Sequence, residues 1–524
     1  MVCCQKETQT ARYTKQKTLL VANGGEPKAL DPQLVTGVIE SRIITALMEG
    51  LVADDAKSDT AMPPGAAESW SHNENFTEWT FLLRKNGVWS DGKPLTAHDF
   101  VFAYHRMLHP DTAAPYASML HFLKNAQAFN EGKMSEFSEV GVKAVDDHTL
   151  HLTMREPVPF LPDLTRHYTW FAVPKHTILR FGKMTDRHTK WTEPENFVSN
   201  GGFTLKSWQM NSHIDVVKNP NYWNAANVKL QGIRFFAIDN PATETRAYLA
   251  GQLHITQRVP AEMLQKLGQT HPKELRIEPY VGTQFIRFNT QRKGLDDARV
   301  RRALAMAIDR EALCKSVYEG YTPADTMSPD LGNYKPETGF TFDPQQAQKL
   351  LAAAGFPEGK NFPRYKILTS GKVALAAQAI QAQWQKNLGV RVDIQSMDYA
   401  SSIQAMQKLD YDIMPLGWIG DYLDPTTFLL MWKKGDGNNC TGWSNEKFEA
   451  LLTQAAQRTS EAERLADFVQ AEKLFMEEMP IAPLVWVSSL YMLDPSVKNW
   501  HPLMLNNHPW TSIDLEAENK EVKP

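Results

Sequence analysis

The sequence predicts an α/β protein whose core is divided between at least two lobes. Its 524 residues are about three times the length of a typical domain of roughly 150 residues. From Asp297 onward, segments with helical periodicity alternate with short apolar segments typical of strands, which indicates a lobe with a largely parallel sheet. We find no internal repeat, low-complexity tract or long linker, so we expect the lobes to be tightly joined.

The first half of the chain mixes strands and helices. Segments with the features of strands are Leu19 to Ala22, Glu68 to Trp70, Trp79 to Arg84, Val88 to Thr96 around an Asp-Gly turn, Val142 to Arg155 as a pair, and Ile233 to Ile238. Helices are predicted over Ser41 to Leu51 and Ala97 to Leu108. Thr96 is the expected N-cap of the second helix, which places Phe100, Tyr104 and Leu108 on one face.

In the second half, the expected helices begin at Asp297, where Val300, Ala303, Leu304, Ala307 and Ile308 share a face. Further helices are predicted over Ala347 to Ala354 and Leu375 to Leu388. The expected strands between and after them are Tyr365 to Leu368, Val390 to Ile394 and Tyr411 to Leu416.

Composition excludes two classes of protein. The net charge is -4, with 22% charged residues, so the chain has no long-range attraction for nucleic acid. No apolar run approaches the roughly 18 residues that a membrane-spanning helix needs. We therefore expect a globular chain that neither spans a membrane nor binds nucleic acid.

The four cysteines are Cys3, Cys4, Cys314 and Cys440, and their spacing favours neither a zinc site nor a disulfide framework. Cys3 and Cys4 precede a polar segment, and we interpret residues 1–18 as a flexible tether. In one interpretation Cys3 or Cys4 is the acylation site of a lipoprotein. In the other, both are merely exposed ends of the chain.

Motifs for catalysis and cofactors are weak. The segment from Gly355 to Lys360 resembles a phosphate loop, but its spacing is one residue short and no Ser or Thr follows Lys360, so we predict a turn. His105 and His109 lie four apart on a predicted helix without the neighbouring glutamate of a metalloprotease. We expect no catalytic residues, metal or cofactor, although a peptide or glycan hydrolase with a triad scattered in sequence stays open as an alternative.

Several segments together resemble a known family, the oligopeptide-binding proteins of ABC importers, solute-binding family 5. The segments that carry the resemblance span most of the chain and are Glu26 to Pro32, Glu68 to Arg106, Ser199 to Phe203, Asn219 to Asn224, Phe288 to Gln291, Val300 to Leu304 and Gly417 to Pro425. The family's members are periplasmic or otherwise extracytoplasmic. The resemblance therefore implies a binding protein and not an enzyme.

The resemblance also implies an architecture. It is the two-lobed periplasmic-binding-protein fold, class II-like, with an extra inserted domain. The expected domain I comprises residues 19–48, 174–283 and 489–524, domain II residues 49–173, and domain III residues 284–488. Two chain crossings, near Gly282-Thr283 and near Val487-Ser488, would act as a hinge on which the lobes close around a ligand.

The ligand that the resemblance implies is a peptide of about two to five residues with a free amino terminus. An extended peptide offers its own N–H and C=O groups, so a protein binds many sequences by pairing with the backbone. In the family's pattern Val38, Gly417 and Ile419 supply those backbone groups. Tyr116 and Trp418 line the space for side chains, and Phe285 is a further expected contact.

Two aspartates of the Gly417 to Pro425 segment have different expected roles. Asp424 precedes Pro425 and a predicted helix from Thr426 to Trp432, so helix capping explains it fully. Asp421 has no such local role. It matches the family's anchor for the ligand's α-amino group.

The chain departs from the family's pattern where related proteins bind the ligand's carboxylate. Met406 and Pro415 stand at positions of arginines, and Val373 stands at the position of a histidine. Arg287 replaces an acidic or neutral pocket residue and would place a cation against the ligand's side chains. Lys372 is a second candidate cation.

The implied partners are short peptides and the permease subunits of an ABC importer in the inner membrane, and we expect a monomer. Other cargoes of the same fold stay open, namely nickel, haem, a glycan or a murein peptide, because a fold alone does not choose its ligand.

Overall fold

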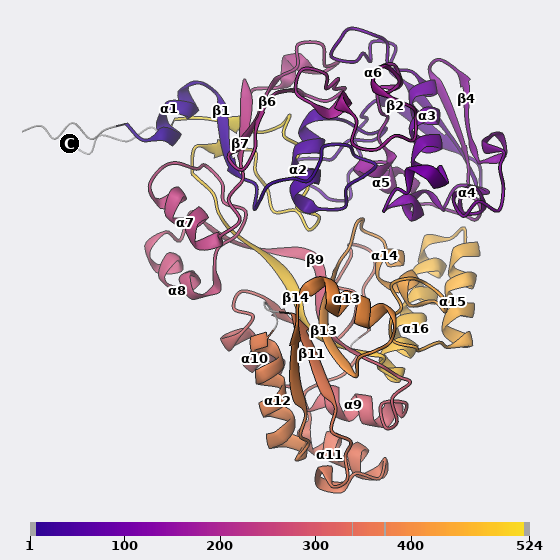
Figure 1. Ribbon diagram of the computed structural model, residues 1–524, viewed down its shortest axis with the longest axis vertical. Helices are drawn as coiled ribbons and strands as arrows, with labels where there is room; N and C mark the ends of the chain where they lie inside the picture. Colours follow the sequence, from indigo (N-terminus) through magenta and orange to yellow (C-terminus); the bar gives the residue numbers. More distant parts are fainter. Residues whose placement is uncertain (1–6, 338, 371–373, 518–524) are drawn as a thin grey trace, which may run out of the picture. The chain divides into compact units, whose positions relative to one another are not determined.

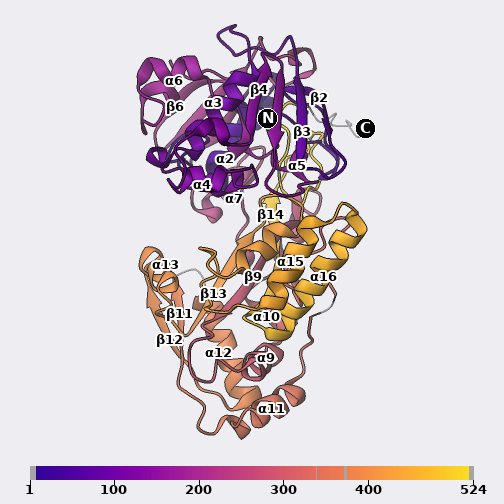
Figure 2. The same cartoon turned by 90° about the vertical axis from the view of Figure 1, so that its right-hand side faces the viewer.

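The computed structural model describes residues 7–337, 339–370 and 374–517, which fold into two compact units (Figures 1 and 2). Unit 1 is Met1–Glu278 with Ser489–Pro524, and unit 2 is Pro279–Ser488. Two long strands carry the chain across these boundaries, β9 (Leu275–Phe288) and β14 (Ile481–Met492). The expected crossings near Gly282 and Val487 lie within these two strands.

Unit 1 contains a four-stranded sheet in the order β1-β8-β7-β6. β1 (Thr18–Ala22) runs parallel to β8 (Gly232–Phe236), because the chain completes a long excursion before it returns to pair with the first strand. β7 (His213–Lys218) and β6 (Phe203–Gln209) continue the sheet in antiparallel pairs. Leu19, Leu20 and Val21 are fully buried, so β1 is a core strand as predicted.

A second four-stranded sheet of unit 1 is entirely antiparallel, in the order β2-β3-β5-β4. Its strands are β2 (Ala67–His72), β3 (Glu78–Leu83), β4 (Val142–Asp146) and β5 (Thr149–Thr153). The predicted strand from Val88 to Thr96 is reduced to a single bridge between Val88 and Pro94 around the Asp91-Gly92 turn. Both sheets belong to unit 1, and its division into domains I and II stays a prediction.

Helix α3 (Ala97–Leu108) begins and ends where the sequence predicts. The Asp99 carboxylate accepts a hydrogen bond from the Thr96 backbone N–H at 2.9 Å, which closes a capping box. Phe100, Tyr104 and Leu108 are fully buried. The amphipathic pattern therefore located both the helix and its buried face.

The tether predicted for residues 1–18 is wrong for its described part. Residues Gln9–Lys15 form helix α1, and its Thr10 and Thr14 are buried. Thr14 Oγ1 lies 3.0 Å from His254 Nε2, while His254 Nδ1 accepts the Leu20 backbone N–H at 3.0 Å. Because the buried face of α1 is made of threonines that meet a buried histidine, hydrophobic periodicity gave no signal. Cys3 and Cys4 lie outside the described residues.

The remaining elements of unit 1 are short. They are α2 (Val38–Leu47), α4 (Ala126–Asn130), α5 (Leu161–Leu164), α6 (Lys175–Phe181), α7 (Pro241–Leu249), α8 (Ala261–Thr270), β15 (Val497–Lys498) and β16 (Asp514–Leu515). Helix α2 begins and ends earlier than predicted, after Gly37 in extended conformation.

Unit 2 is built on a six-stranded sheet in the order β10-β14-β9-β13-β11-β12. Its other strands are β10 (Thr322–Pro323), β11 (Lys366–Ser370), β12 (Asp393–Met397) and β13 (Ile413–Ile419). Among the described pairings, β12 with β11 and β11 with β13 are parallel, while β13 with β9 and β14 with β10 are antiparallel. The predicted largely parallel sheet is therefore wrong: its other half consists of β10 and the two strands that connect the units, β9 and β14.

Helices surround this sheet in Figure 2. They are α9 (Ala298–Met306), α10 (Arg310–Ser316), α11 (Pro344–Ala353), α12 (Ala374–Leu388), α13 (Tyr399–Gln407), α14 (Thr426–Leu429), α15 (Glu446–Gln457) and α16 (Glu461–Glu478). The segment from Gly355 to Lys360 is the predicted turn, with a short 3-10 helix over Pro357–Gly359. Across the described ranges, no helix combines the length and apolar character that a bilayer crossing requires.

Candidate functional site

Strand β13 has one edge that is mostly unpaired. On one side it pairs antiparallel with β9 over its whole length, from Ile413 opposite Phe288 to Ile419 opposite Gly282. On the other side it pairs with β11 at a single position, Ile413 opposite Ile367. Within the part of the chain that the structure describes, no strand pairs with residues 414–419 on this side, which we call the open edge of β13.

The phase of the β9–β13 ladder shows which backbone groups face the open edge. The Asn289 N–H donates to Asp412 O at 2.9 Å, and the Gly420 N–H donates to Val281 O at 2.7 Å. Alternate residues of an antiparallel strand bond the same neighbour, so the even-numbered residues between them face β9 and the odd-numbered residues face the open edge. Pro415 has no N–H. Gly417 and Ile419 therefore present both an N–H and a C=O to the open edge.

Side chains from α14 and β9 hold this stretch in place. The indole Nε1–H of Trp418 donates to Thr427 O at 2.8 Å, so the ring is fixed by α14 and stays partly exposed. A Cβ atom at Gly417 would lie 2.3 Å from Gln284 Nε2, so the Gln284 side chain of β9 packs directly against this glycine. No sequence motif indicated the roles of Gln284 and Thr427, because they act through tertiary contacts.

Asp421 follows the open edge, and its carboxylate has no partner among the residues that the structure describes. Its backbone N–H donates to Thr427 Oγ1 at 3.2 Å. Its half-buried carboxylate forms no hydrogen bond or ion pair with any residue of the described ranges. Desolvation by burial raises the pKa of Asp421 to about 7. An ammonium group placed here would restore the ionised carboxylate.

Asp424 has partners within the protein besides the helix that it caps. The prediction that capping explains it fully is therefore wrong. Its Oδ1 accepts hydrogen bonds from the Thr426 N–H at 3.0 Å and the Thr426 hydroxyl at 2.7 Å. It also forms a bidentate ion pair with Arg464, with Nη1–Oδ2 and Nη2–Oδ1 distances of 2.7 and 2.8 Å. Both side chains are buried. Arg464 lies in α16, so no local pattern could have revealed the pair.

Arg287 and Phe285 lie inside unit 2, with only 1% and 0% of their surfaces exposed. Arg287 Nη1 donates to Asn438 O at 2.8 Å, and its guanidinium carbon lies 5.2 Å from the centre of the Trp432 ring and 5.8 Å from that of Phe285. Burial lowers the pKa of Arg287. Direct contact of these two residues with a ligand stays a prediction, and their burial argues against it.

The other predicted site residues are distributed over the chain. Val38 begins α2 and is 44% exposed, and Tyr116 is partly buried beside His167 at a ring separation of 6.1 Å; both belong to unit 1. Met406 is buried in an apolar cluster with Met414 and Tyr411. Lys372 and Val373 lie outside the described residues.

Comparisons with known proteins place this geometry in a family. A family model described as bacterial extracellular solute-binding proteins, family 5 Middle, matches residues 61–440. The chain is 34% identical over 496 residues to the periplasmic oligopeptide-binding protein OppA of Salmonella typhimurium, covering 92% of this chain and 89% of that protein. It is 35% identical over 491 residues to the periplasmic murein peptide-binding protein MppA of Escherichia coli, covering 91% and 88%.

A solved structure shows the same fold. The complex of Haemophilus influenzae OppA with the peptide RPPGFSPFR superposes with a TM-score of 0.80 at 30% identity and covers 96% of this chain and 99% of that one. The predicted class, a periplasmic-binding-protein fold of the α/β type, is confirmed. With a family model that matches most of its length and relatives similar over nine-tenths of it, this chain belongs to the bacterial extracellular solute-binding proteins of family 5.

Proposed function

We propose that this chain is the extracytoplasmic substrate-binding component of an ABC importer and captures short peptides in extended form. The observation that carries the proposal is the half-buried Asp421 carboxylate, which lacks a partner within the described residues and follows directly on the open edge of β13. A peptide with a free amino terminus supplies the missing cation. The names of the relatives, OppA and MppA, support a peptide as the ligand.

In this proposal the peptide adds a strand to β13. Its N–H and C=O groups pair with those of Gly417 and Ile419, and its α-ammonium binds Asp421. Pairing through the backbone is independent of the peptide's sequence, while the single charged contact fixes its direction. Trp418 borders the space for one side chain.

The proposal includes a movement. Unit 1 and unit 2 close on the peptide through β9 and β14, and Val38 and Tyr116 join the site from unit 1. The closed form excludes water from the ammonium and from Asp421, which strengthens their attraction. The protein acts as a monomer that delivers peptides of two to five residues to the permease subunits, with Cys3 or Cys4 as an optional lipid anchor.

The test of the backbone pairing is a titration of the peptide-free protein with trialanine and with its N-methylated analogues. We expect one N-methyl position to abolish a hydrogen bond to β13 and to weaken binding roughly tenfold, since losing a buried hydrogen-bond partner costs about 1–3 kcal/mol. Equal affinity for every analogue would contradict the added strand. Mass spectrometry after incubation should return trialanine intact, whereas cleavage products would favour the hydrolase alternative.

A murein peptide is the second candidate cargo, favoured by the similarity to MppA. Native mass spectrometry of the protein purified without denaturation separates the two, because captured peptides are identified by their masses. A bound mass that contains amino sugars or wall-specific residues would identify the cargo as a murein fragment.

A further inference from the structure

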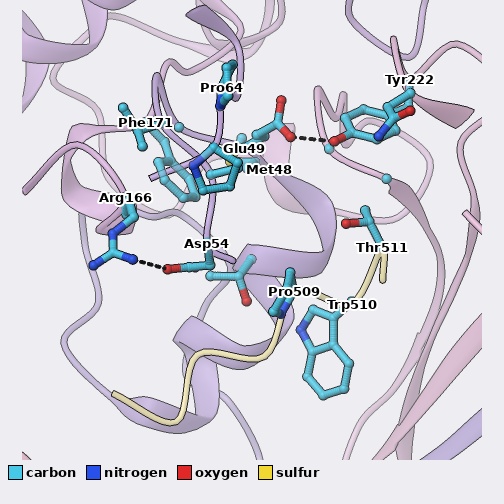
Figure 3. A pocket seen from close by; sticks show the side chains of 18 of the residues that line it. Met48, Glu49, Asp54, Pro64, Arg166, Phe171, Tyr222, Pro509, Trp510 and Thr511 are labelled. Atoms are coloured by element: carbon cyan, nitrogen blue, oxygen red, sulfur yellow. Dashed lines mark hydrogen bonds and ion pairs between the residues drawn. The ribbon is translucent and has the colours of Figure 1, made fainter. Parts of the chain in front are cut away.

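Unit 1 contains a pocket of its own, so it is distinct from the open edge of β13. Its volume is about 320 Å³, and it lies at the end of α2 (Figure 3). Side chains that line it include Glu49, Asp54, Arg166, Phe171, Tyr222 and Pro509. Pockets that combine apolar walls with a few convergent polar groups are the usual form of small-molecule sites.

Two of the sequence motifs that the peptide site leaves unexplained build this pocket. In the motif from Ser199 to Phe203, the Asn200 side chain accepts the Glu49 N–H at 3.2 Å and donates to Glu49 O at 2.9 Å. Gly202 approaches the C-terminal segment so closely that a Cβ would lie 2.4 Å from Thr511 Cγ2. The motif from Asn219 to Asn224 contributes Tyr222 and Trp223.

The Glu49 carboxylate is held from one side by neutral donors. The Tyr222 hydroxyl donates to Oε1 (Figure 3). Trp223 Nε1–H donates to Oε2 at 2.8 Å. Arg84 stacks over the Trp223 ring at 3.6 Å and donates to Gly65 O, and it forms no ion pair with Glu49 within the described residues. Desolvation by burial raises the pKa of Glu49 to about 7.

Asp54 is less well satisfied than Glu49. Its one polar contact among the described residues is an ion pair of 3.5 Å with Arg166 Nη1 (Figure 3). Arg166 is shared, because it also pairs with the buried Asp163 and donates to Asp59 O at 2.9 Å. Burial raises the pKa of Asp54 to about 7, and the nearby carboxylates of Asp163 and Asp59 add to this.

The balance of charge around the pocket decides the sign of a ligand. Glu49, Asp54, Arg84 and Arg166 line the pocket. The carboxylates of Asp59 and Asp163 lie close to Asp54, and the Arg42 guanidinium lies close to His508, so carboxylates outnumber guanidiniums among these described groups. His508 does not alter this balance, because burial, with the charges of Arg42 and His501, lowers its pKa to about 3 and keeps it neutral. This excess of negative charge favours a cationic ligand over an anion.

We infer that this pocket binds a small organic amine, with the ammonium at Asp54 and Glu49 and the alkyl part against Phe171, Pro64 and Pro509. An ammonium donates three hydrogen bonds and needs no fixed coordination number. A bare divalent cation needs more oxygen ligands, and the residues that the structure describes contain no group of three or more histidine, cysteine or acidic side chains placed to hold one.

The inferred site has a definite pH dependence. In the amine-free protein the two carboxylates take up protons as the pH falls through about 7. A bound ammonium favours their ionised forms, so binding at pH 6 must expel protons and is weaker than binding at pH 8. Alkylamines stay protonated over this range, since ammonium groups of this kind lose their proton near pH 10.

The experiment is calorimetric titration of the full chain with n-butylamine at pH 6 and pH 8, with butyrate as the matched anion. We expect butylamine to bind more tightly at pH 8, with proton release that is visible when buffers of different ionisation enthalpy are compared, and butyrate not to bind. Asp54→Asn should weaken butylamine binding about tenfold, the size typical of a lost charge-assisted hydrogen bond. Glu49→Gln should weaken it as well, which gives a second variant if the first folds poorly.

Asp421→Asn is the matched control, because it removes a carboxylate with a similarly raised pKa from unit 2. It should leave butylamine binding unchanged, and Asp54→Asn should leave trialanine binding unchanged, so failure of this inference and failure of the proposed peptide site are distinguished. No heat of binding at either pH, binding without proton release, or loss of butylamine binding only in Asp421→Asn would overturn the inference.

Discussion

Asp421 and Asp424 lie in one short segment of unit 2 and have opposite surroundings. Asp424 is buried against Arg464 and Thr426, with every contact supplied by the protein. Asp421 is half-buried and has no partner in the described residues, so the loss of water around its carboxylate raises its pKa. The Asp424 carboxylate therefore holds the segment in place, and the Asp421 carboxylate stays available to a ligand.

The largest expected effect is on stability. Asp424→Ala removes the bidentate pair with the buried Arg464, and breaking a buried ion pair typically costs about 3–5 kcal/mol. Urea denaturation of the variant should show a loss of this size. In an Arg464→Met background most of the loss should disappear, because the ion pair is already absent there. A loss of only about 1 kcal/mol in the native background would reduce Asp424 to a simple helix cap.

Asp421 should behave in the opposite way in the peptide-free protein. Its pKa is higher in the folded state than in the unfolded state, so the folded state binds more protons between about pH 4 and 7. Asp421 therefore lowers the free energy of unfolding increasingly as the pH rises through that window. Asp421→Asn should therefore be more stable than the native protein at pH 8, on the order of 1 kcal/mol for a half-exposed group, and equal to it near pH 4. A stability difference that is independent of pH would contradict the raised pKa.

A smaller effect, on peptide affinity, is expected from Arg287. It is a buried cation whose neighbours within the described residues include no carboxylate within ion-pair distance. If its field reaches the ligand, tripeptides with an acidic side chain bind about fivefold better than matched lysine peptides, equivalent to about 1 kcal/mol. Arg287→Met should remove this preference. Equal affinity of the native protein for both peptides would confine Arg287 to a structural role.

Local patterns predicted much of the fold. The α3 helix, its Thr96 cap and the strand β1 were correct because caps and periodicity are encoded within a few residues. The prediction of a tether was wrong at α1, where the buried Thr14 contacts His254, a residue far away in the sequence. The prediction of a largely parallel sheet was wrong because β9, which enters unit 2, and β14, which leaves it, belong to the same sheet. No local pattern encodes this.

The candidate site was predicted mainly through the resemblance to a family. Gly417, Ile419 and Asp421 lie at or just after the end of β13, and their roles in binding stay a prediction. The burial of Arg287, the ion pair between Asp424 and Arg464, and the pocket around Glu49 depend on contacts between distant segments. Such contacts leave no signature in a single sequence.

A double-mutant cycle between Asp421 and the peptide's amino group tests directly whether Asp421 is the amino anchor. Calorimetric titration would compare trialanine and N-acetyl-trialanine on the native protein and on Asp421→Ala. We predict that acetylation weakens binding to the native protein by roughly two to three orders of magnitude, the loss expected when one partner of a buried pair is removed, and that this penalty largely vanishes in Asp421→Ala. Equal binding of the two peptides to the native protein would contradict the assignment of Asp421 as the amino anchor.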